Sequence, residues 1–557
     1  MGRVTNITVR NYKSVGAAVH LRFPEGVPLI LVGENNAGKS NIIRGLDLVL
    51  GESWPGTYEP EDHDYHLRNK DNIPIEIAVH VEGVIHEDRR LPHGVECFIL
   101  CYPPPPNGKS FYMVYDDGAN NPYVSNETRE QCLCILVGAD RRLSYQMSYA
   151  SKYTFLSKLM HRFHKALTAD PDRVEKLQTT FEEVKSLFQG VPSFSAFTEE
   201  LQRQVADLSE NLEYGLKVDF SAYDPSNPFH ALRIYPQQDD RVLTYEELGT
   251  GQEQILALSF AQAYAKAFHG EGGLLLAIEE PEAHLHPLAR KWVGHKIREL
   301  AGQGVQVAVT THSPAFLDIM GLEGIALLRK ENGATQIIQL TREQLAEYCK
   351  QHGAAKVSAD SILPFYAAGA TEEILAGFFA RKVVLVEGPT EALALPVYLA
   401  RTGLDVTKSG IAVIPVHGVT NLAKWWRLFS AYSIPVYIVF DNDAQRDPDM
   451  RRRADLLTTL AVPPADHENL LKKTSVVVGK GYAVLGNNCE DALRSLFEPA
   501  YAVLEDKARQ ELGVPAGQSK PLVARYVAQH MPYDEEAMGW KMFKALTRKL
   551  IGLKARV

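Results

Sequence analysis

The chain has 557 residues, of which 45% are hydrophobic and 23% charged, and its formal net charge is −9. This length favours two to four domains, and the composition excludes a disordered or fibrous protein. No apolar run is long enough to span a bilayer, and a strand-like pattern follows Met1 directly, so we expect a cytoplasmic protein without a membrane partner. The negative charge does not exclude nucleic acid, since binding depends on a local basic patch.

The first predicted element with a chemical signature is an apolar strand that runs into Gly33-x-x-x-x-Gly38-Lys39-Ser40, ahead of a helix over 42–50. This is the P-loop pattern, in which glycines let backbone N–H groups turn toward phosphates. Lys39 would reach the β- and γ-phosphates, and Ser40 would ligate Mg²⁺. The sequence therefore predicts bound ATP with Mg²⁺, and the candidate nucleotide-binding residues in this loop are Gly33, Asn35, Asn36, Gly38, Lys39, Ser40 and Asn41.

The six cysteines are scattered along the chain, and four of them lie in two apolar, strand-like runs, as Cys97, Cys101, Cys132 and Cys134. Their Cys-x-Cys spacing matches zinc sites poorly. Buried strand thiols are the favoured interpretation and a zinc site is the alternative.

Residues 151–215 change character, because apolar residues recur at steps of three and four. The pattern predicts helices, one of which begins at Asp170-Pro171 and ends at Gly190. A helical block inside a strand-rich region is expected to be an insertion. Its role is packing or, as the sharper hypothesis, a dimer contact.

Two later strands end in residues suited to nucleotide hydrolysis. The run 274–278 leads into Glu279 and Glu280, one placed to hold the Mg²⁺ shell and the other to polarise the attacking water. The run 306–310 is followed by His312, which could sense the γ-phosphate.

A second group of acids follows strands predicted at 382–386, 411–416 and 435–440. Glu387 and Glu391 are one helical turn apart, and Asp441 and Asp443 alternate after a strand, so each pair can face one spot. Four converging carboxylates repel one another unless cations neutralise them. Two Mg²⁺ or Mn²⁺ ions acting on a phosphodiester would meet that demand, whereas solvated turn acids are the alternative.

The first group of motifs, together with Asn11-Tyr12-Lys13-Ser14, resembles the ABC-type ATPases of the SMC/RecF branch. Residues 248–252 are similar to the ABC signature, which implies that Gly249, Thr250, Gly251 and Gln252 contact ATP bound by a second subunit, in a homodimer or higher homo-oligomer. Glu279 stands where the family has aspartate, and Gly249 where it has serine. His284 and His286 fall at the position of the family's dimer-contacting loop, which is favoured over metal binding.

The second group resembles the Toprim domain, and an ABC ATPase fused ahead of a Toprim domain is the architecture of OLD-family nucleases, here most similar to the class of the Gabija anti-phage nuclease. The resemblance implies DNA nicking or cleavage, a UvrD-like helicase as a partner, and two further residues. Glu490 would be a metal ligand, with Asp491 as competitor, and Lys520 would stabilise charge on the phosphate. Asn488 replaces the aspartate that the family has there.

The expected fold class is α/β. An ABC-type ATPase domain (1–150 and 216–370) would contain a helical dimerisation insertion (151–215) and precede a Rossmann-like Toprim domain (378–557). The Toprim domain would end in a basic tail that follows a phosphate backbone or forms a solvated helix face, with Lys541, Lys544, Arg548, Lys549, Lys554 and Arg556. The predicted function is an ATP-regulated, metal-dependent DNA endonuclease in anti-phage defence. The alternative is an SMC/RecF-like DNA clamp without nuclease activity.

Overall fold

The computed structural model describes residues 2–138 and 273–555, except for short gaps at 52, 71–72, 89–90, 107, 284 and 443–449. Between 139 and 272 it describes only scattered residues, among them 169–176. The chain divides into two compact units, one formed by Met1–Gly138 with Phe268–Val557 and the other by Ala139–Ala267. The first unit holds both predicted groups of polar residues, apart from the signature at 248–252.

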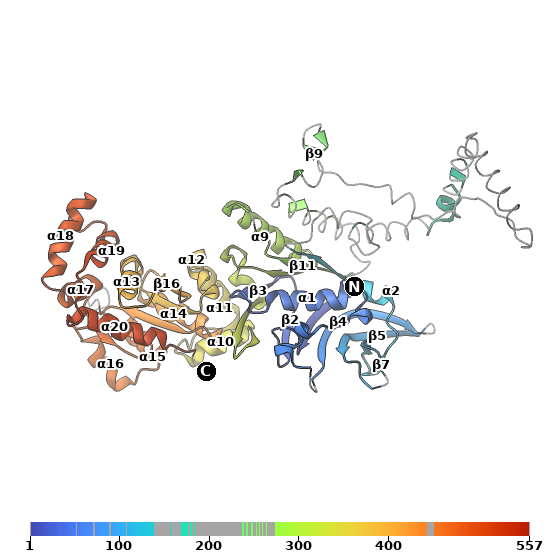
Figure 1. Ribbon diagram of the computed structural model, residues 1–557, viewed down its shortest axis with the longest axis horizontal. Coiled ribbons are helices and arrows are strands. Elements are labelled where there is room, and N and C mark those ends of the chain that lie inside the picture. The colour runs from blue at the N-terminus through green and yellow to red at the C-terminus, as the bar shows by residue number, and fades with distance from the viewer. Residues whose placement is uncertain are drawn as a thin grey trace, which may run out of the picture. The chain divides into compact units, whose positions relative to one another are not determined.

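Six antiparallel strands form a sheet in the N-terminal part of the first unit, in the order β2-β1-β4-β5-β6-β7 (Figure 1). The strands are β1 (Arg3–Arg10), β2 (Val19–Arg22), β4 (Ile75–Asp88), β5 (Leu91–Tyr102), β6 (Phe111–Tyr115) and β7 (Asn120–Asn121). Short helices join this sheet to the rest of the unit, namely η1 (Pro55–Thr57), η2 (Asp62–Asp64), η3 (His66–Arg68) and α2 (Asn126–Glu130).

A second six-stranded sheet has the order β14-β13-β3-β12-β11-β8 and is parallel except for β14. Its strands are β3 (Leu29–Gly33), β8 (Cys132–Val137), β11 (Gly273–Glu279), β12 (Gln306–Thr310), β13 (Ile325–Glu331) and β14 (Ala334–Gln339). Because β3, β12 and β11 are adjacent and parallel, the residues that follow them lie at one edge of the sheet. That edge carries the P-loop, His312 and Glu279.

Helix α1 (Lys39–Leu50) joins the two sheets into one hydrophobic core. Its buried Ile42, Ile43 and Leu46 share that core with residues of the antiparallel sheet, such as Ile77, and of the parallel sheet, such as Leu31. The helix begins at Lys39 rather than at the predicted residue 42, because the chain turns into the helix directly after Gly38.

Helix α9 (Pro287–Gly302) lies between β11 and β12, and η5 (Pro314–Phe316) and η6 (Ile319–Gly324) lie between β12 and β13. Four helices lead from β14 to the next sheet, namely α10 (Arg342–Gln351), α11 (Ala359–Ala367), α12 (Glu372–Leu375) and η7 (Ala376–Phe379). None of the helices in the described residues is both long and apolar enough to cross a membrane.

The C-terminal sheet has the order β16-β15-β17-β19-β18, with four parallel strands and an antiparallel β18 at one edge. The strands are β15 (Lys382–Val386), β16 (Ile411–Pro415), β17 (Val436–Phe440), β18 (Val477–Val478) and β19 (Tyr482–Val484). The predicted strands at 382–386, 411–416 and 435–440 are thus confirmed to within one residue. Their apolar runs are buried, as expected for parallel strands covered by helices.

Helices surround this sheet (Figure 1). Alternate residues of β15 and β17, such as Val384 and Tyr437, share a core with α13 (Pro389–Arg401), α17 (Cys489–Leu496), α18 (Ala500–Leu512), α19 (Lys520–His530) and α20 (Met538–Ile551). Helix α14 (Val419–Ala431) packs against β15 and β17, α15 (Arg451–Thr459) against α14, and α16 (Pro464–Leu471) against α15.

The basic segment at 541–557 is largely a packed helix rather than a tail. Helix α20 buries Trp540, Phe543, Leu546 and Leu550 at helical spacing. On its exposed side, Lys541 pairs with Glu536 at 2.7 Å and Lys544 with Glu535 at 3.0 Å. The segment is therefore a helix that its apolar stripe anchors in the core, and binding of a phosphate backbone by its exposed basic side stays a prediction.

Two other predictions have outcomes in the fold. The cysteines at 97, 101, 132 and 134 are buried in β5 and β8 and form no disulfide, which confirms the favoured interpretation of buried strand thiols. In the second unit, residues 171–176 are helical and the Asp170 carboxylate accepts a hydrogen bond from the N–H of Asp172 at 3.1 Å, in agreement with the predicted helix start. Most of the predicted insertion at 151–215 lies outside the described residues. Two short strands, β9 (Gln237–Gln238) and β10 (Arg241–Val242), also belong to this unit.

Candidate functional site

The P-loop is held in a shape that requires glycine at two positions. Gly33 has φ 141°, and a Cβ added there would lie 2.1 Å from the Leu328 carbonyl oxygen. Gly38 has φ 104°, and its Cβ would lie 2.4 Å from Thr335 Oγ1 and 2.6 Å from Ser14 Oγ. Both conformations are strained for any residue with a side chain. The loop is therefore built against β13, β14 and the Ser14 turn.

Thr335 and Ser14 support this loop, a role that the sequence did not predict for either residue. Thr335 Oγ1 donates to the Ala37 carbonyl oxygen at 2.9 Å and lies in hydrogen-bond contact with Ser14 Oγ at 2.8 Å, and Asn41 Nδ2 donates to the same Ser14 oxygen at 2.6 Å. Ser14 was noted only as part of the opening motif. Nothing in the sequence marks Thr335, which lies almost 300 residues after the loop and meets it only through the pairing of β13 with β3.

Lys39 is buried, and its Nζ donates to the carbonyl oxygens of Gly33 and Glu34, each at 2.9 Å. Burial lowers the pKa of Lys39 to about 8, although Glu280, Glu282 and Glu34 act in the opposite direction. A buried cation at the start of a helix, where backbone N–H groups lack partners within the helix, is an arrangement suited to phosphate.

The acids after β11 lie beside this cation. The Oε1 atom of Glu279 is buried without a hydrogen-bond partner among the described residues. Glu280 has φ 47°, and its N–H donates to the Thr310 carbonyl oxygen at 2.9 Å. His312 Nε2 lies 3.6 Å from Glu280 Oε1, and burial, with the nearby Lys39, lowers the pKa of His312. A buried carboxylate oxygen with no protein donor fits a Mg²⁺ ligand.

The structure describes only one of the predicted signature residues. Gly249, Thr250 and Gly251 lie outside the described residues, whereas Gln252 is helical and exposed. His284 also lies outside them. His286 caps α9, because its Nδ1 accepts from the N–H of Leu288 at 3.4 Å. That contact gives His286 a structural role.

The second group of acids collects at the carboxyl ends of β15 and β17, which are paired in parallel. Glu387 follows β15 and Asp441 follows β17, and the Asp441 N–H donates to Glu387 Oε1 at 3.1 Å. Glu391, in the first turn of α13, is 7% exposed and accepts from the Gly388 N–H at 3.2 Å. Asp443 lies outside the described residues.

These acids line one pocket of about 750 Å³ with later residues of the chain. The lining residues with polar side chains are Glu387, Thr390, Glu391, His417, Asp441, Asn487, Asn488, Glu490, Asp491 and Lys520. Within 2–138 and 273–555, apart from the gaps, no three acids, histidines or cysteines surround one point as a closed metal cluster. The carboxylates instead face a shared, open space.

The two buried glutamates carry raised pKa values. Burial, then the neighbouring Asp441, raises the pKa of Glu387 to about 8, while Arg453 acts in the opposite direction. Burial, with Asp441 and Glu490 nearby, raises the pKa of Glu391 to about 7. Such shifts mean that ionised carboxylates are costly here without further cations. The oxygen-rich, acidic lining fits Mg²⁺ or Mn²⁺.

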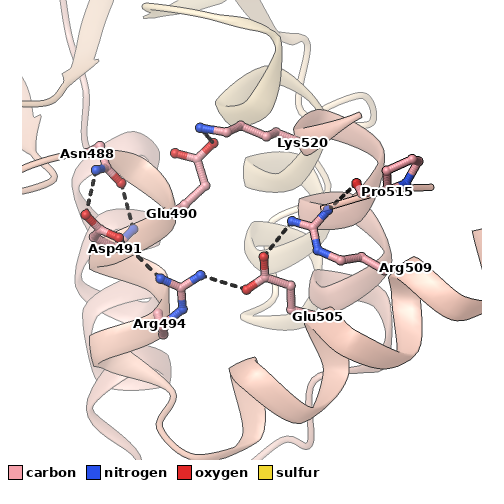
Figure 2. Close-up of polar contacts among 8 residues, drawn as sticks. All are labelled: Asn488, Glu490, Asp491, Arg494, Glu505, Arg509, Pro515 and Lys520. Atoms are coloured by element: carbon pink, nitrogen blue, oxygen red, sulfur yellow. Dashed lines mark hydrogen bonds and ion pairs between the residues drawn. The ribbon is translucent and has the colours of Figure 1, made fainter. Parts of the chain in front are cut away.

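The late residues form a separate wall of the pocket, drawn in Figure 2. Lys520 Nζ lies 3.8 Å from Glu490 Oε1. Asp491 is engaged elsewhere, since its N–H and carboxylate bond to the Asn488 side chain at 2.7 and 2.6 Å and it pairs with Arg494 at 3.3 Å. Of the two competing acids, Glu490 is thus the one beside Lys520. Asn488, the departure from the family pattern, caps α17.

Arg453 is a residue of this site that the sequence analysis missed. It is 2% exposed and its guanidinium pairs with Asp441 Oδ1 at 3.2 Å and Glu387 Oε1 at 3.5 Å. The available signal was weak, because Arg453 ends a run of three arginines that resembles a solvated helix face. Its position three and four residues before the buried Leu456 and Leu457 would have placed it on the inner face of α15.

Comparisons with known proteins match both halves of the chain. Residues 378–443 match the family model described as the Toprim domain of overcoming lysogenization defect (OLD) protein-like proteins, and residues 136–317 match the AAA ATPase domain. The chain is 24% identical to the OLD nuclease of Thermus scotoductus, with 95% of this chain and 99% of that protein covered. It is 21% identical to the Old nuclease of Escherichia phage P2, covering 82% and 80%. It is 24% identical to the endonuclease GajA of Bacillus cereus, covering 33% and 28%.

Proposed function

We propose that this chain, which is similar to OLD nucleases and joins an ATPase domain to an OLD-like Toprim domain, is an ATP-regulated, divalent-metal-dependent DNA endonuclease. The observation that carries the proposal is the acidic pocket at the carboxyl ends of β15 and β17, which also contains one lysine. Ligands of α/β sheets bind at this edge. The similar proteins are named as nucleases, which supports phosphodiester hydrolysis as the reaction, and the pocket contains residues suited to that reaction.

The residues that would hold Mg²⁺ or Mn²⁺ are Glu387, Glu391, Asp441 and Glu490, with Asp443 assigned from the sequence. The metal would polarise the phosphodiester and lower the pKa of the attacking water. Lys520 would bind a non-bridging phosphate oxygen, because its side chain is half-exposed in the same pocket and reaches Glu490. Its charge would stabilise the extra negative charge of the transition state.

In the ATPase domain, Lys39 would bind the β- and γ-phosphates, and Ser40 and Glu279 would hold Mg²⁺. Glu280 would orient the attacking water, with His312 beside it. This assignment rests on the strand order β3-β12-β11, which brings the loop, the histidine and the two acids to one edge.

Regulation by ATP is supported by contacts between the P-loop and the start of the Toprim sheet. Arg381, directly before β15, pairs with Glu34 of the P-loop at 3.0 Å. Arg329 of β13 donates to the Ala380 carbonyl oxygen at 2.9 Å. The other end of β15 leads into Glu387, so a change at the phosphate site has a short, rigid route to the acidic pocket.

The proposal includes a homodimer or higher homo-oligomer, because the ABC signature at 248–252 would complete the nucleotide site of another subunit. DNA is the proposed substrate. The similarity to GajA extends the proposal to anti-phage defence. The family resemblance of the sequence adds a UvrD-like helicase as a proposed partner.

A plasmid assay tests the central proposal. Supercoiled DNA is incubated with the protein and Mg²⁺ or Mn²⁺, with and without ATP, beside Glu387→Ala and Lys39→Ala. We expect cleavage that Glu387→Ala abolishes and whose response to ATP Lys39→Ala removes. Absence of cleavage with either metal would refute the nuclease, and cleavage by Glu387→Ala would refute the site.

A further inference from the structure

Arg453 places a positive charge inside the acidic pocket wall. Its Nη2 atom contacts both Glu387 Oε1 and Asp441 Oδ1, and its Nε donates to the Asp441 carbonyl oxygen. The guanidinium thus contacts one carboxylate after β15 and one after β17, the adjacent parallel strands.

The burial of this arginine is unusual for its position. Its neighbours Arg451 and Arg452 on the same helix are exposed, whereas Arg453 is 2% exposed. The Glu387 and Asp441 side chains are each 14% exposed. A buried arginine is tolerated only where carboxylates and carbonyl oxygens compensate its charge, as the Glu387 and Asp441 side chains and the Asp441 carbonyl oxygen do here.

The remaining charged groups around the pocket do not duplicate this role. Lys520 approaches from α19 and pairs with Glu490 (Figure 2). Arg494 pairs with Asp491 and Glu505, on a neighbouring wall. Glu391 faces the pocket from α13. Of these bases in the described residues, Arg453 is the one whose ion pairs include Glu387 and Asp441.

We propose that Arg453 is a built-in cation of the metal site: it neutralises and orients the Glu387–Asp441 pair in place of one divalent ion, so that the pair is pre-arranged for a single ion. This inference rests on the metal site of the proposed function. Arg453 is a positioning residue, since it acts through the two carboxylates. Arginine suits this role because its planar fork can hold two oxygens at fixed directions.

The inference predicts opposite changes in metal binding and in cleavage. Arg453 repels a divalent ion bound by the same carboxylates, so its removal tightens metal binding by roughly tenfold or more. The same removal frees the carboxylates to turn, and misplaced catalytic groups lose activity. An arginine that merely held α15 in place would lower both quantities when replaced.

The test measures Mn²⁺ binding to the full-length protein without nucleotide, by titration calorimetry and by electron paramagnetic resonance of free Mn²⁺. The variants are Arg453→Met, which keeps the length of the side chain, and Arg453→Lys, which keeps the charge. Arg452→Met, which removes an exposed charge one residue away, is the matched control. Arg453→Met combined with Glu387→Gln assigns any gained binding to this site.

We expect Arg453→Met to bind Mn²⁺ roughly tenfold more tightly than the natural protein, to cleave DNA more slowly, and to gain more thermal stability from Mn²⁺. Arg453→Lys keeps the weaker binding, and the added Glu387→Gln removes the gain. Unchanged or weaker binding by Arg453→Met overturns the inference while the metal site stands. The inference is also overturned if Arg453→Met stays unfolded in Mn²⁺, because the ion should replace the lost charge. If neither protein binds Mn²⁺, the metal site itself fails, and the inference with it.

Discussion

At the carboxyl end of β3 a buried lysine donates to two carbonyl oxygens, whereas at the carboxyl ends of β15 and β17 two partly buried carboxylates pair with a buried arginine. Both sites lie at the carboxyl ends of parallel strands, where loops from several strands meet and the backbone N–H groups of the next helix are exposed. They differ in the sign of the charge that the protein buries. The first is arranged for an anionic ligand, and the second for cations that in turn bind an anion.

The strongest way to break the second site is to remove one carboxylate charge while keeping its shape. Glu387→Gln is expected to slow plasmid cleavage by roughly a thousandfold, since a metal supplies several kcal/mol of transition-state stabilisation. Glu373→Gln, an exposed residue of α12, is the matched control and should cleave normally. Gel-based rates measure both, and a loss of less than about tenfold would remove Glu387 from the metal site.

At the first site the corresponding change is Lys39→Met. We expect ATP affinity, measured by fluorescent-nucleotide titration, to fall by about tenfold to a hundredfold, because a charge-assisted contact to phosphate is lost. Cleavage without ATP should be retained, which separates the two sites. Equal ATP binding by Lys39→Met would contradict the proposed P-loop.

The comparison also predicts a pH dependence for the acidic site. Glu387 and Glu391 have pKa values raised to about 8 and about 7, so the metal-free folded state retains protons that the unfolded state has released. Unfolding free energy of the metal-free protein should therefore fall as pH rises from about 4.5 to about 8. Saturating Mn²⁺ should reduce this fall, because the ion replaces the protons.

Cleavage at limiting Mn²⁺ should rise toward pH 8, by about tenfold per unit for each proton displaced, and its midpoint should move to lower pH as Mn²⁺ is raised. Rates across pH at two Mn²⁺ concentrations measure this. A midpoint that does not depend on Mn²⁺ would argue against competition between metal and protons.

The smallest expected effect concerns the contact between the sites. Arg381→Glu should weaken the response of cleavage to ATP by a few-fold, while stability changes by only about 1 kcal/mol or less, because the ion pair with Glu34 is largely exposed. The exchange of both residues, Glu34→Arg with Arg381→Glu, should restore part of the response. Arg342→Glu breaks a comparably exposed pair with Glu323 and is the control. A normal response in Arg381→Glu would exclude this route.

The sequence predicts best where a residue's role is encoded within a short segment. Strands β15, β16 and β17 were predicted closely because each is an apolar run ended by polar or glycine residues. Glu387 and Asp441 could be paired in advance, since parallel strands end at one edge. The P-loop glycines were equally accessible, because both positive φ angles belong to one motif.

Prediction fails where a role depends on a partner far along the chain. Thr335 supports the P-loop only after β13 has paired with β3. Arg453 resembled part of a charged surface because its burial depends on the packing of α15, which single residues do not encode. The basic residues near the end were compatible with a tail or with a solvated helix face, and the packing of Trp540, Phe543 and Leu546 into the core decides for a helix.

One contact has a consequence for how the protein is made. Lys382, at the start of β15, donates to the carbonyl oxygens of Leu550 and Ile551 at the end of α20, at 2.7 and 2.6 Å. The amino end of the first strand of this sheet is thus hydrogen-bonded to the end of a helix 169 residues later. At about 5–20 residues per second, translation needs roughly 8–34 seconds to cover that interval. During that interval the nascent chain already has its P-loop strands but lacks the helix that binds the start of β15. The sheet that carries the acidic pocket therefore completes its core only after α20 has been synthesised.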